Sequence, residues 1–219
     1  MRDIYVKELE DISNKLAEQT TAVVENYRLA IQSLNQADET ISARLQESDL
    51  KINQMAVDIE KEAYRLVALQ QPVAEDLRLI FTVMSVSDDL ERIGDHAVLI
   101  AKNVKRSSDD AEVIESLVLI INQMAEKTFE MLDQVQEALA TRDAQKARLI
   151  ADQDELVDAG LKRLYKESSS RMESNPEAIN PGVNYIAIGN SVERIGDYIT
   201  NICERIVYLT EASMVDLNR

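Results

Sequence analysis

The chain has 219 residues, of which 40 are acidic and 24 basic, so its formal net charge is −16. A surface this negative repels phosphate backbones and anionic lipid headgroups, which argues against nucleic acid as a partner and favours cations or basic protein surfaces. Only 5 glycines and 3 prolines are present, too few turn residues for a β-rich or α/β protein of this length. The composition therefore indicates helices packed through aliphatic side chains.

Three features of the sequence predict a soluble cytoplasmic protein. Cys203 is the only cysteine and cannot form an intrachain disulfide, which fits a reducing compartment. Charges begin at Arg2 and no apolar stretch follows, so we expect no signal peptide. No uncharged run approaches the roughly 18–20 residues of a membrane span, so we expect no insertion into a membrane.

Apolar residues at steps of three and four predict long amphipathic helices along the whole chain. Residues 37–41 separate the first helix from the second, with Asp38 and Thr40 as candidate caps. Pro72 marks the start of the third helix, because proline is tolerated only in the first turn of a helix. The polar run 107–110 divides a first repeat, 1–107, from a second, 108–219. The apolar stripes span residues 5–34, 45–66, 83–104, 114–139, 150–164 and about 180–209.

Each half should form a three-helix bundle, because three helices of roughly 30 residues, each about 45 Å long, can bury their stripes against one another. The predicted fold class is thus all-α, with two tandem pseudo-symmetric three-helix bundles and six long antiparallel helices. The run Asn180-Pro181-Gly182 lies where the sixth helix should begin. That helix either starts at Pro181 or is broken there.

An exact repeat supports the two-unit plan. The sequence ERIGD at 91–95 recurs at 193–197, at equivalent places in two similar helical series. Identical words at a fixed period indicate an internal duplication. The helix before each copy also matches, with Leu45, Asp49, Ile52, Ala56 and Ile59 corresponding to Ile150, Asp154, Val157, Leu161 and Leu164.

The repeated word contains two acids with a glycine between them. Glu91 and Asp95 are four residues apart, so they share one helix face at about 5–6 Å between Cβ atoms, where two carboxylates repel unless water or a cation lies between them. Gly94 lowers helix propensity by about 1 kcal/mol, and a mid-helix glycine often marks the close approach of another backbone. A solvated face explains one such pair, whereas the recurrence, glycine included, favours a site.

The preceding helices carry acids inside their apolar stripes. Asp49 and Asp154 each fall between two apolar positions, where a carboxylate costs several kcal/mol unless it is paired or coordinated. Asn53 and Asp158 follow four residues later, so each half offers oxygen ligands on two neighbouring helices, a set suited to divalent cations. Alternatively, the two aspartates lie near helix starts and interact only with the helix dipole.

The sequence argues against catalysis. His96 is the only histidine, with Ile93 three residues before it, whereas di-iron carboxylate bundles need a Glu-x-x-His on each of two helices. His96 could add a ligand in the first half, but its counterpart in the second copy is Tyr198, so we expect a surface or rim histidine. We expect Cys203 to serve packing, since it lacks a histidine base. We therefore predict that the chain is not an enzyme.

Two stretches of the first half and one of the second resemble the PhoU family. They are QQPVAEDLR at 70–78, LERIGDH at 90–96 and VERIGDY at 192–198, the last followed by Asn201 and Ile202. The resemblance implies a cytoplasmic accessory protein of the phosphate-specific ABC transporter that restrains phosphate uptake and keeps the phosphate-starvation response off. It also implies contacts with the transporter's ATPase subunit and a sensor histidine kinase, peripheral association with the membrane through these partners, and a homodimer.

The resemblance further implies metal ions on the acidic faces, with iron or zinc expected and magnesium or manganese as alternatives. Two departures from the family pattern stand in the first half, where Asn53 replaces an acid and Leu99 stands where the second copy has Asn201. The second-half site is therefore expected to be the better one. Carried over by position, the metal ligands are Asp49, Asn53, Glu91 and Asp95 in the first half and Asp154, Asp158, Glu193 and Asp197 in the second.

Three functions follow in order of preference. The first is a phosphate-signalling regulator that acts through protein partners. The second is a metal-buffering protein or a metal-dependent helical-bundle enzyme, and the third is a plain helical adaptor whose acids bind nothing. Metal content and a phosphatase or oxidase assay distinguish them.

Overall fold

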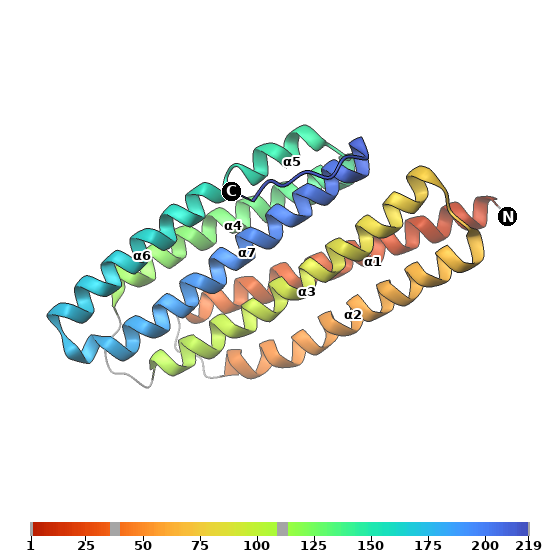
Figure 1. Ribbon diagram of the computed structural model, residues 1–219. Helices are drawn as coiled ribbons and strands as arrows, with labels where there is room; N and C mark the ends of the chain where they lie inside the picture. Colours follow the sequence, from red (N-terminus) through yellow and green to blue (C-terminus); the bar gives the residue numbers. More distant parts are fainter. Residues whose placement is uncertain (1, 36–39, 109–113, 219) are drawn as a thin grey trace.

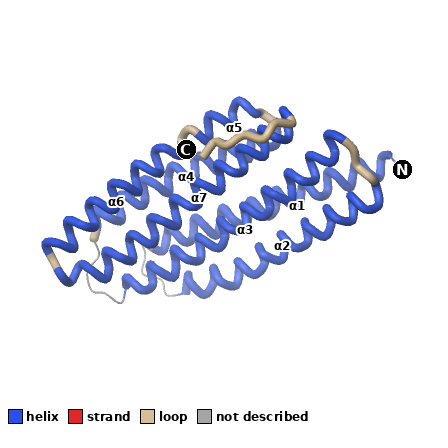
Figure 2. Tube along the Cα trace, in the orientation of Figure 1, coloured by secondary structure: helices blue, strands red, loops and turns tan. Residues whose placement is uncertain are grey.

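The computed structural model describes residues 2–35, 40–108 and 114–218, and within these ranges the chain is helical and contains no strand (Figure 2). The predicted all-α class with six long helices is confirmed. The elements in chain order are α1 (Arg2–Ser33), α2 (Thr40–Gln70), α3 (Ala74–Ser108), α4 (Glu115–Thr141), α5 (Ala144–Ala151), α6 (Asp154–Ser174), the short 3₁₀ turn η1 (Pro176–Ala178) and α7 (Ile179–Glu211).

The helices form two groups that lie side by side, with three helices in the first and four in the second (Figure 1). In the first group α1, α2 and α3 pack on one another, and in the second α4 and α7 pack together with α5 and α6. The groups meet mainly through α3 and α7, the two helices that carry the ERIGD words, and also through α1 and α4. The duplicated words thus lie on the two central helices, and the predicted division at 107/108 falls in the last turn of α3.

A single aliphatic core runs through both groups. Tyr27 of α1 is fully buried, and its hydroxyl lies 2.8 Å from Oγ1 of Thr128 in α4. Because the Thr128 hydroxyl donates to the carbonyl of Ala125 (2.9 Å), the proton shared with Tyr27 comes from the tyrosine. The Tyr27 ring also lies 4.4 Å from that of Phe129, so one side chain ties the two repeats together.

The predicted fifth helix, drawn from the stripe 150–164, is wrong in one respect, because the structure divides it into α5 and α6 at Asp152 and Gln153. Aspartate competes with helical hydrogen bonds and favours helix ends. Here the amide of Gln153 donates to the carbonyl of Ile150 (3.0 Å), and α6 restarts at Asp154. The second helix of the first repeat, α2, is unbroken, so the two repeats differ at this point.

The question left open at Asn180-Pro181-Gly182 is answered, since α7 begins at Ile179 and continues through all three residues. Pro181 is the third residue of the helix, where the missing N–H would have had no intrahelical partner. The turn η1 precedes it, and the side chain of Asn175 accepts a hydrogen bond from the amide of Glu177 (3.1 Å). A proline in the first turn therefore does not break the helix.

The connection between α2 and α3 differs slightly from the prediction. The third helix begins at Ala74 rather than at Pro72, and both Gln71 (φ 49°) and Ala74 (φ 46°) adopt the left-handed conformation that glycine usually occupies. Of the two predicted caps, Asp38 lies outside the described residues and Thr40 is the first residue of α2. Along the described part of the chain, none of the helices combines the length and apolarity needed to cross a bilayer.

After α7 the chain reverses direction. Ala212 has φ 55°, and its amide donates to the carbonyl of Tyr208 (2.9 Å), a left-handed helix end. Residues 213–218, which we call the return segment, then run back without regular structure beside α5 and α7 (Figures 1 and 2). The side chains of Val215 and Leu217 pack against the core. No pattern in the sequence predicted this segment.

Candidate functional site: two acidic patches

The structure places the eight predicted ligands on two pairs of neighbouring helices. We call the residues on α2 and α3 the first patch and those on α6 and α7 the second patch. The helices of each pair pack on one another, so each patch combines side chains from two elements. The first patch is Asp49, Asn53, Glu91 and Asp95, and the second is Asp154, Asp158, Glu193 and Asp197.

Gly94 forms the base of the first patch. A Cβ atom at this position would lie 3.3 Å from Oδ1 of Asp49, so the glycine lets the carboxylate of α2 rest on the backbone of α3. Oδ1 of Asp49 and Oδ1 of Asn53 are buried and accept no hydrogen bond from the described residues. Burial, followed by the charge of Asp95, raises the pKa of Asp49, while Lys102 and a hydrogen bond from Asn53 act in the opposite direction.

Gly196 has the same role in the second patch, with tighter packing. A Cβ here would lie closer than 3.0 Å to Oδ1 of Asp154, which is also buried and without a partner among the described residues. Burial raises the pKa of Asp154 to about 7, and the charges of Asp197, Asp158 and Glu193 add to the effect. Burial is likewise the main reason that the pKa values of Glu193 and Asp197 are raised, although Arg194 opposes it for both.

The repeated glycine therefore does mark a close approach, but the approaching group is a side-chain carboxylate and not the backbone that was predicted. Asp49 and Asp154 are half-buried against α3 and α7 rather than enclosed in the core. The alternative that they lie at helix starts holds for Asp154, the first residue of α6, and not for Asp49, which is in the interior of α2. Even for Asp154 the helix dipole does not dominate, because its pKa is raised rather than lowered.

Cys203 packs in the core as expected, and His96 lies between the two repeats. His96 is half-buried at the junction of the repeats, with its ring centroid 5.8 Å from that of Tyr198, and burial lowers its pKa. Cys203 is a fully buried free thiol, and burial raises its pKa to about 12, so it packs and is not poised as a nucleophile.

One ionisable residue of the central interface was not predicted. Asp89 of α3 accepts a hydrogen bond from the side chain of Asn201 of α7 (3.4 Å), and burial raises its pKa to about 6. The only signal was Asn201 itself, which stands where the first repeat has Leu99. Its partner could not be found from the sequence because Asp89 lies in the other repeat.

The donor set of each patch suits a hard or borderline cation, because it consists of carboxylate and amide oxygens. Asp49, Asn53 and Asp154 each have a buried oxygen without a partner in the described residues, as expected for groups that can accept a cation. As the side chains stand, however, the described chain holds no group of three Asp, Glu, His or Cys residues close enough to bind one ion. Binding therefore requires side-chain rotations within the patch.

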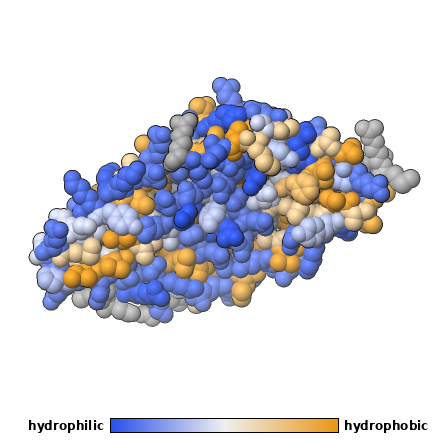
Figure 3. Space-filling view, viewed as in Figure 1, coloured by the Kyte–Doolittle hydropathy of each residue, from blue (hydrophilic) through white to orange (hydrophobic). Residues whose placement is uncertain are grey.

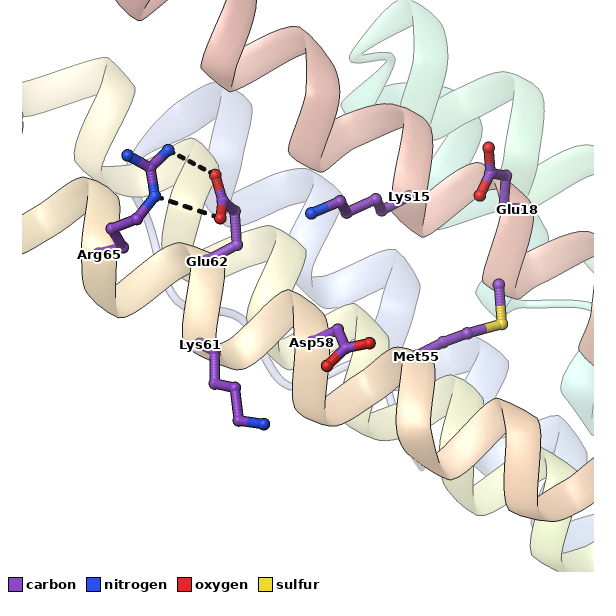
Figure 4. Close-up of a pocket in the computed structure, with 7 residues that line it drawn as sticks. All are labelled: Lys15, Glu18, Met55, Asp58, Lys61, Glu62 and Arg65. Atoms are coloured by element: carbon purple, nitrogen blue, oxygen red, sulfur yellow. Dashed lines mark hydrogen bonds and ion pairs between the residues drawn. The ribbon is translucent and has the colours of Figure 1, made fainter.

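A groove that includes none of the patch residues lies between α1 and α2 (Figure 4). It encloses about 480 Å³, but its three basic and three acidic side chains balance one another. Arg65 is held by Glu62 (2.6 Å) and Glu8 (2.8 Å), so its charge is already compensated. The groove is lined by Lys15, Glu18, Met55, Asp58, Lys61, Glu62 and Arg65.

The fold and the paired patches define a class of helical proteins built from two copies of one three-helix repeat. The family model described as the PhoU domain matches the chain twice, at residues 16–104 and 121–206. The chain belongs to the PhoU family.

Relatives and solved structures agree with this assignment. The phosphate-specific transport system accessory protein PhoU homolog of Clostridium acetobutylicum is 34% identical over 218 residues, covering 99% of each chain, and that of Streptococcus pneumoniae is 35% identical over 218 residues, covering 100% of each. The crystal structure of the phosphate transport system regulatory protein PhoU from Streptococcus pneumoniae superimposes with a TM-score of 0.90 at 34% identity, over 97% of this chain and 99% of that one. The crystal structure of PhoU from Pseudomonas aeruginosa superimposes with a TM-score of 0.91 at 32% identity, over 95% of this chain and 100% of that one. These relatives are named as accessory or regulatory proteins, not as enzymes.

The two glycines permit a matched test of the patch geometry. Gly196→Ala is expected to push the Asp154 carboxylate into solvent and lower its pKa from about 7 by more than one unit, because the new methyl occupies the position of Oδ1. In Gly94→Ala the new Cβ would lie 3.3 Å from Oδ1 of Asp49, so the carboxylate can stay in place and the Asp49 pKa should be nearly unchanged. Both changes raise helix propensity by the same amount, about 1 kcal/mol. A difference between the two variants in the aspartate pKa, measured by carboxyl NMR titration, therefore reports the packing against the glycine. An unchanged Asp154 pKa in Gly196→Ala would contradict the packing described for the second patch.

Proposed function

We propose that the chain is a cytoplasmic regulator of phosphate uptake and a negative regulator of the phosphate-starvation response. In this proposal it acts by binding the ATPase subunit of the phosphate ABC transporter and a sensor histidine kinase. Membership of the PhoU family and the phosphate-transport names of its relatives support the general role. The names of these relatives give no support to the alternative function, a metal-dependent helical-bundle enzyme.

We also propose that each patch binds a divalent cation, iron or zinc in the first place, as a structural or regulatory element. The carrying observation is the same in both repeats: a carboxylate oxygen without a partner in the described residues, pressed against a helical glycine beside further acids. A bound cation would supply positive charge to carboxylates that otherwise repel one another. Asp154 and Asp158 would hold it from α6, and Glu193 and Asp197 from α7.

Exposed apolar side chains offer a surface for protein partners or for a second copy of the chain. Leu69 and Val73, at the α2–α3 connection, are 66% and 73% exposed, and Phe81 on α3 is 46% exposed. Figure 3 shows hydrophobic surface at this end of the molecule. Such a patch, on a strongly acidic molecule, suits contact with a protein rather than with a membrane surface. The proposed homodimer is checked by sedimentation velocity.

The proposal is tested with Glu91→Ala/Glu193→Ala. We expect the purified double variant to lose bound metal and, in cells at high phosphate, a phosphate-starvation reporter to rise severalfold toward the level of a deletion strain. Glu126→Ala changes an exposed acid of α4 outside both patches and is the matched control. A pull-down with the transporter ATPase and the kinase is carried out on the same proteins.

Each outcome has a separate meaning. Metal-free wild-type protein with a normal reporter response would refute the cation sites and leave the regulatory role standing. An unchanged reporter on deletion, together with no recovery of either partner, would refute the regulatory role.

A further inference from the structure

The return segment lies over the second patch. Its residue Leu217 lines a cavity of about 20 Å³ together with Asp154, Asp158 and Glu155, among others. This volume accommodates about one water molecule, or one ion of similar size. The side of the second patch that faces α5 is therefore partly covered by a side chain that comes from beyond the end of α7, while the Asp158 side chain stays 36% exposed.

Two hydrogen bonds hold the return segment in place. The backbone amide of Leu217 donates to Oε1 of Glu204 (2.7 Å), and the side chain of Asn218 donates to Oδ1 of Asn201 (3.2 Å). Asn201 in turn donates to Asp89 of α3 (3.4 Å), so the contact continues to the first repeat. The return segment is long enough to reach Asn201. Its six residues, when extended, span about 20 Å, whereas the stretch of α7 from Glu211 back to Asn201 is only about 15 Å long.

The residues that anchor the segment exist only in the second repeat. At the positions equivalent to Glu204 and Asn201, the first repeat has Lys102 and Leu99. A lysine ammonium has no acceptor for a backbone amide, and leucine has no polar group. The same segment could therefore not be held on the first patch. The duplicated helices thus share their acids but differ in the side chains that can hold a cover.

The return segment makes few contacts, so it can open locally. The segment has no regular structure, four of its six residues are exposed, and Met214 is 78% exposed. Local opening of such segments costs far less than global unfolding. Lifting it would uncover the cavity beside Asp154 and Asp158 without disturbing α6 or α7.

We propose that residues 213–218 form a strap over the α5 side of the second patch, so that a divalent cation reaches the cavity beside Asp154 from this side only when the strap lifts. This gives the two repeats different access to solvent. The proposal rests on the proposed function for the identity of the cation, but the covering of the cavity by the strap does not depend on it.

Access is measured in the cation-free protein with a reporter cysteine. In Asp158→Cys, alkylation by iodoacetamide is followed by peptide mass spectrometry, in which buried Cys203 serves as an internal reference. Removal of residues 213–219 is expected to raise the alkylation rate at position 158 about threefold, because Leu217 covers one side of a position that is otherwise partly exposed. Leu217→Ser should give a smaller increase in the same direction, and Met214→Ser, at an exposed position of the strap, should give none.

Asn53→Cys supplies the same reporter in the first patch, where removal of the strap should leave the rate unchanged. A change of less than twofold at position 158, or equal increases at 158 and 53, would overturn the proposal. The proposed cation is tested separately, by stopped-flow uptake of Mn²⁺ in proteins without the reporter. Faster uptake without the strap supports the proposal, and equal uptake rates overturn its statement about entry. If no variant binds Mn²⁺, the cation sites of the proposed function are refuted for this ion, and the alkylation rates alone decide whether the strap covers the patch.

Discussion

Asp154→Asn is expected to raise the free energy of unfolding of the cation-free protein by about 2 kcal/mol at pH 8. The pKa of Asp154 rises from 3.8 to about 7 on folding. At about 1.4 kcal/mol per pKa unit this corresponds to ~4 kcal/mol, which screening at a half-buried site reduces to about 2 kcal/mol. Asparagine has nearly the same shape and carries no charge, so it avoids this cost.

The sign of the pH dependence follows from proton binding. Between pH 4 and 7 the unfolded chain has lost the Asp154 proton while the folded chain retains it, so the favourable contribution of protonated Asp154 falls as pH rises and is lost above pH 7. The difference between Asp154→Asn and wild type should therefore be near zero at pH 4 and largest at pH 8. Urea unfolding followed by circular dichroism at several pH values measures it.

The matched control is Asp49→Asn, whose effect should be smaller because Lys102 and Asn53 already favour the charged form of Asp49. Addition of a saturating divalent cation should reverse the order at the second patch, stabilising wild type more than Asp154→Asn. A variant less stable than wild type at pH 8 without cation would show that the Asp154 carboxylate contributes favourable contacts, contrary to its unpartnered Oδ1.

Tyr27→Ala should be the most destabilising single change considered, with a loss of about 3–5 kcal/mol in the free energy of unfolding. The side chain is fully buried between the repeats, contacts the Phe129 ring and donates its hydrogen bond to Thr128. Since domains of this kind have only about 5–15 kcal/mol of net stability, the variant should lose a large fraction of it.

Tyr27→Phe separates packing from the hydrogen bond. It keeps the ring and removes only the hydroxyl, so we expect a loss of about 1 kcal/mol. Because one core spans both repeats, Tyr27→Ala should also unfold in a single transition that lies at lower denaturant than wild type. A loss below 1 kcal/mol, or two separate transitions in wild type, would contradict the role given to Tyr27 in joining the repeats.

Much of the fold was readable from the sequence because helices follow from local periodicity. The stripes in α1, α2, α4 and α7 locate these helices to within a few residues, Pro72 does so for the start of α3, and the ERIGD word identifies the duplication. The break between α5 and α6 was missed because the apolar period continues across Asp152 and Gln153. Periodicity shows which residues share a face, but it does not show where hydrogen bonding is interrupted.

The candidate patches were predicted in composition but not in geometry. The spacing of Asp49 and Asn53, and of Glu91 and Asp95, places each pair on one helix face. That Gly94 and Gly196 receive the aspartates of the neighbouring helix became clear only from the packing of α2 on α3 and of α6 on α7. The causes that act on each pKa also come from packing: burial raises the pKa of both aspartates, Lys102 opposes this for Asp49, and the charge of Asp158 adds to it for Asp154.

The sequence by itself therefore determined the helical class, the two repeats and the residues that carry charge, since each of these depends on neighbours within one helical turn or on an exact word match. Only the tertiary structure decided which carboxylates press against which glycines, that Tyr27 links the repeats and that residues 213–218 lie over the second patch. These contacts join residues far apart along the chain, and their free energies depend on burial, which exists only once the helices have packed.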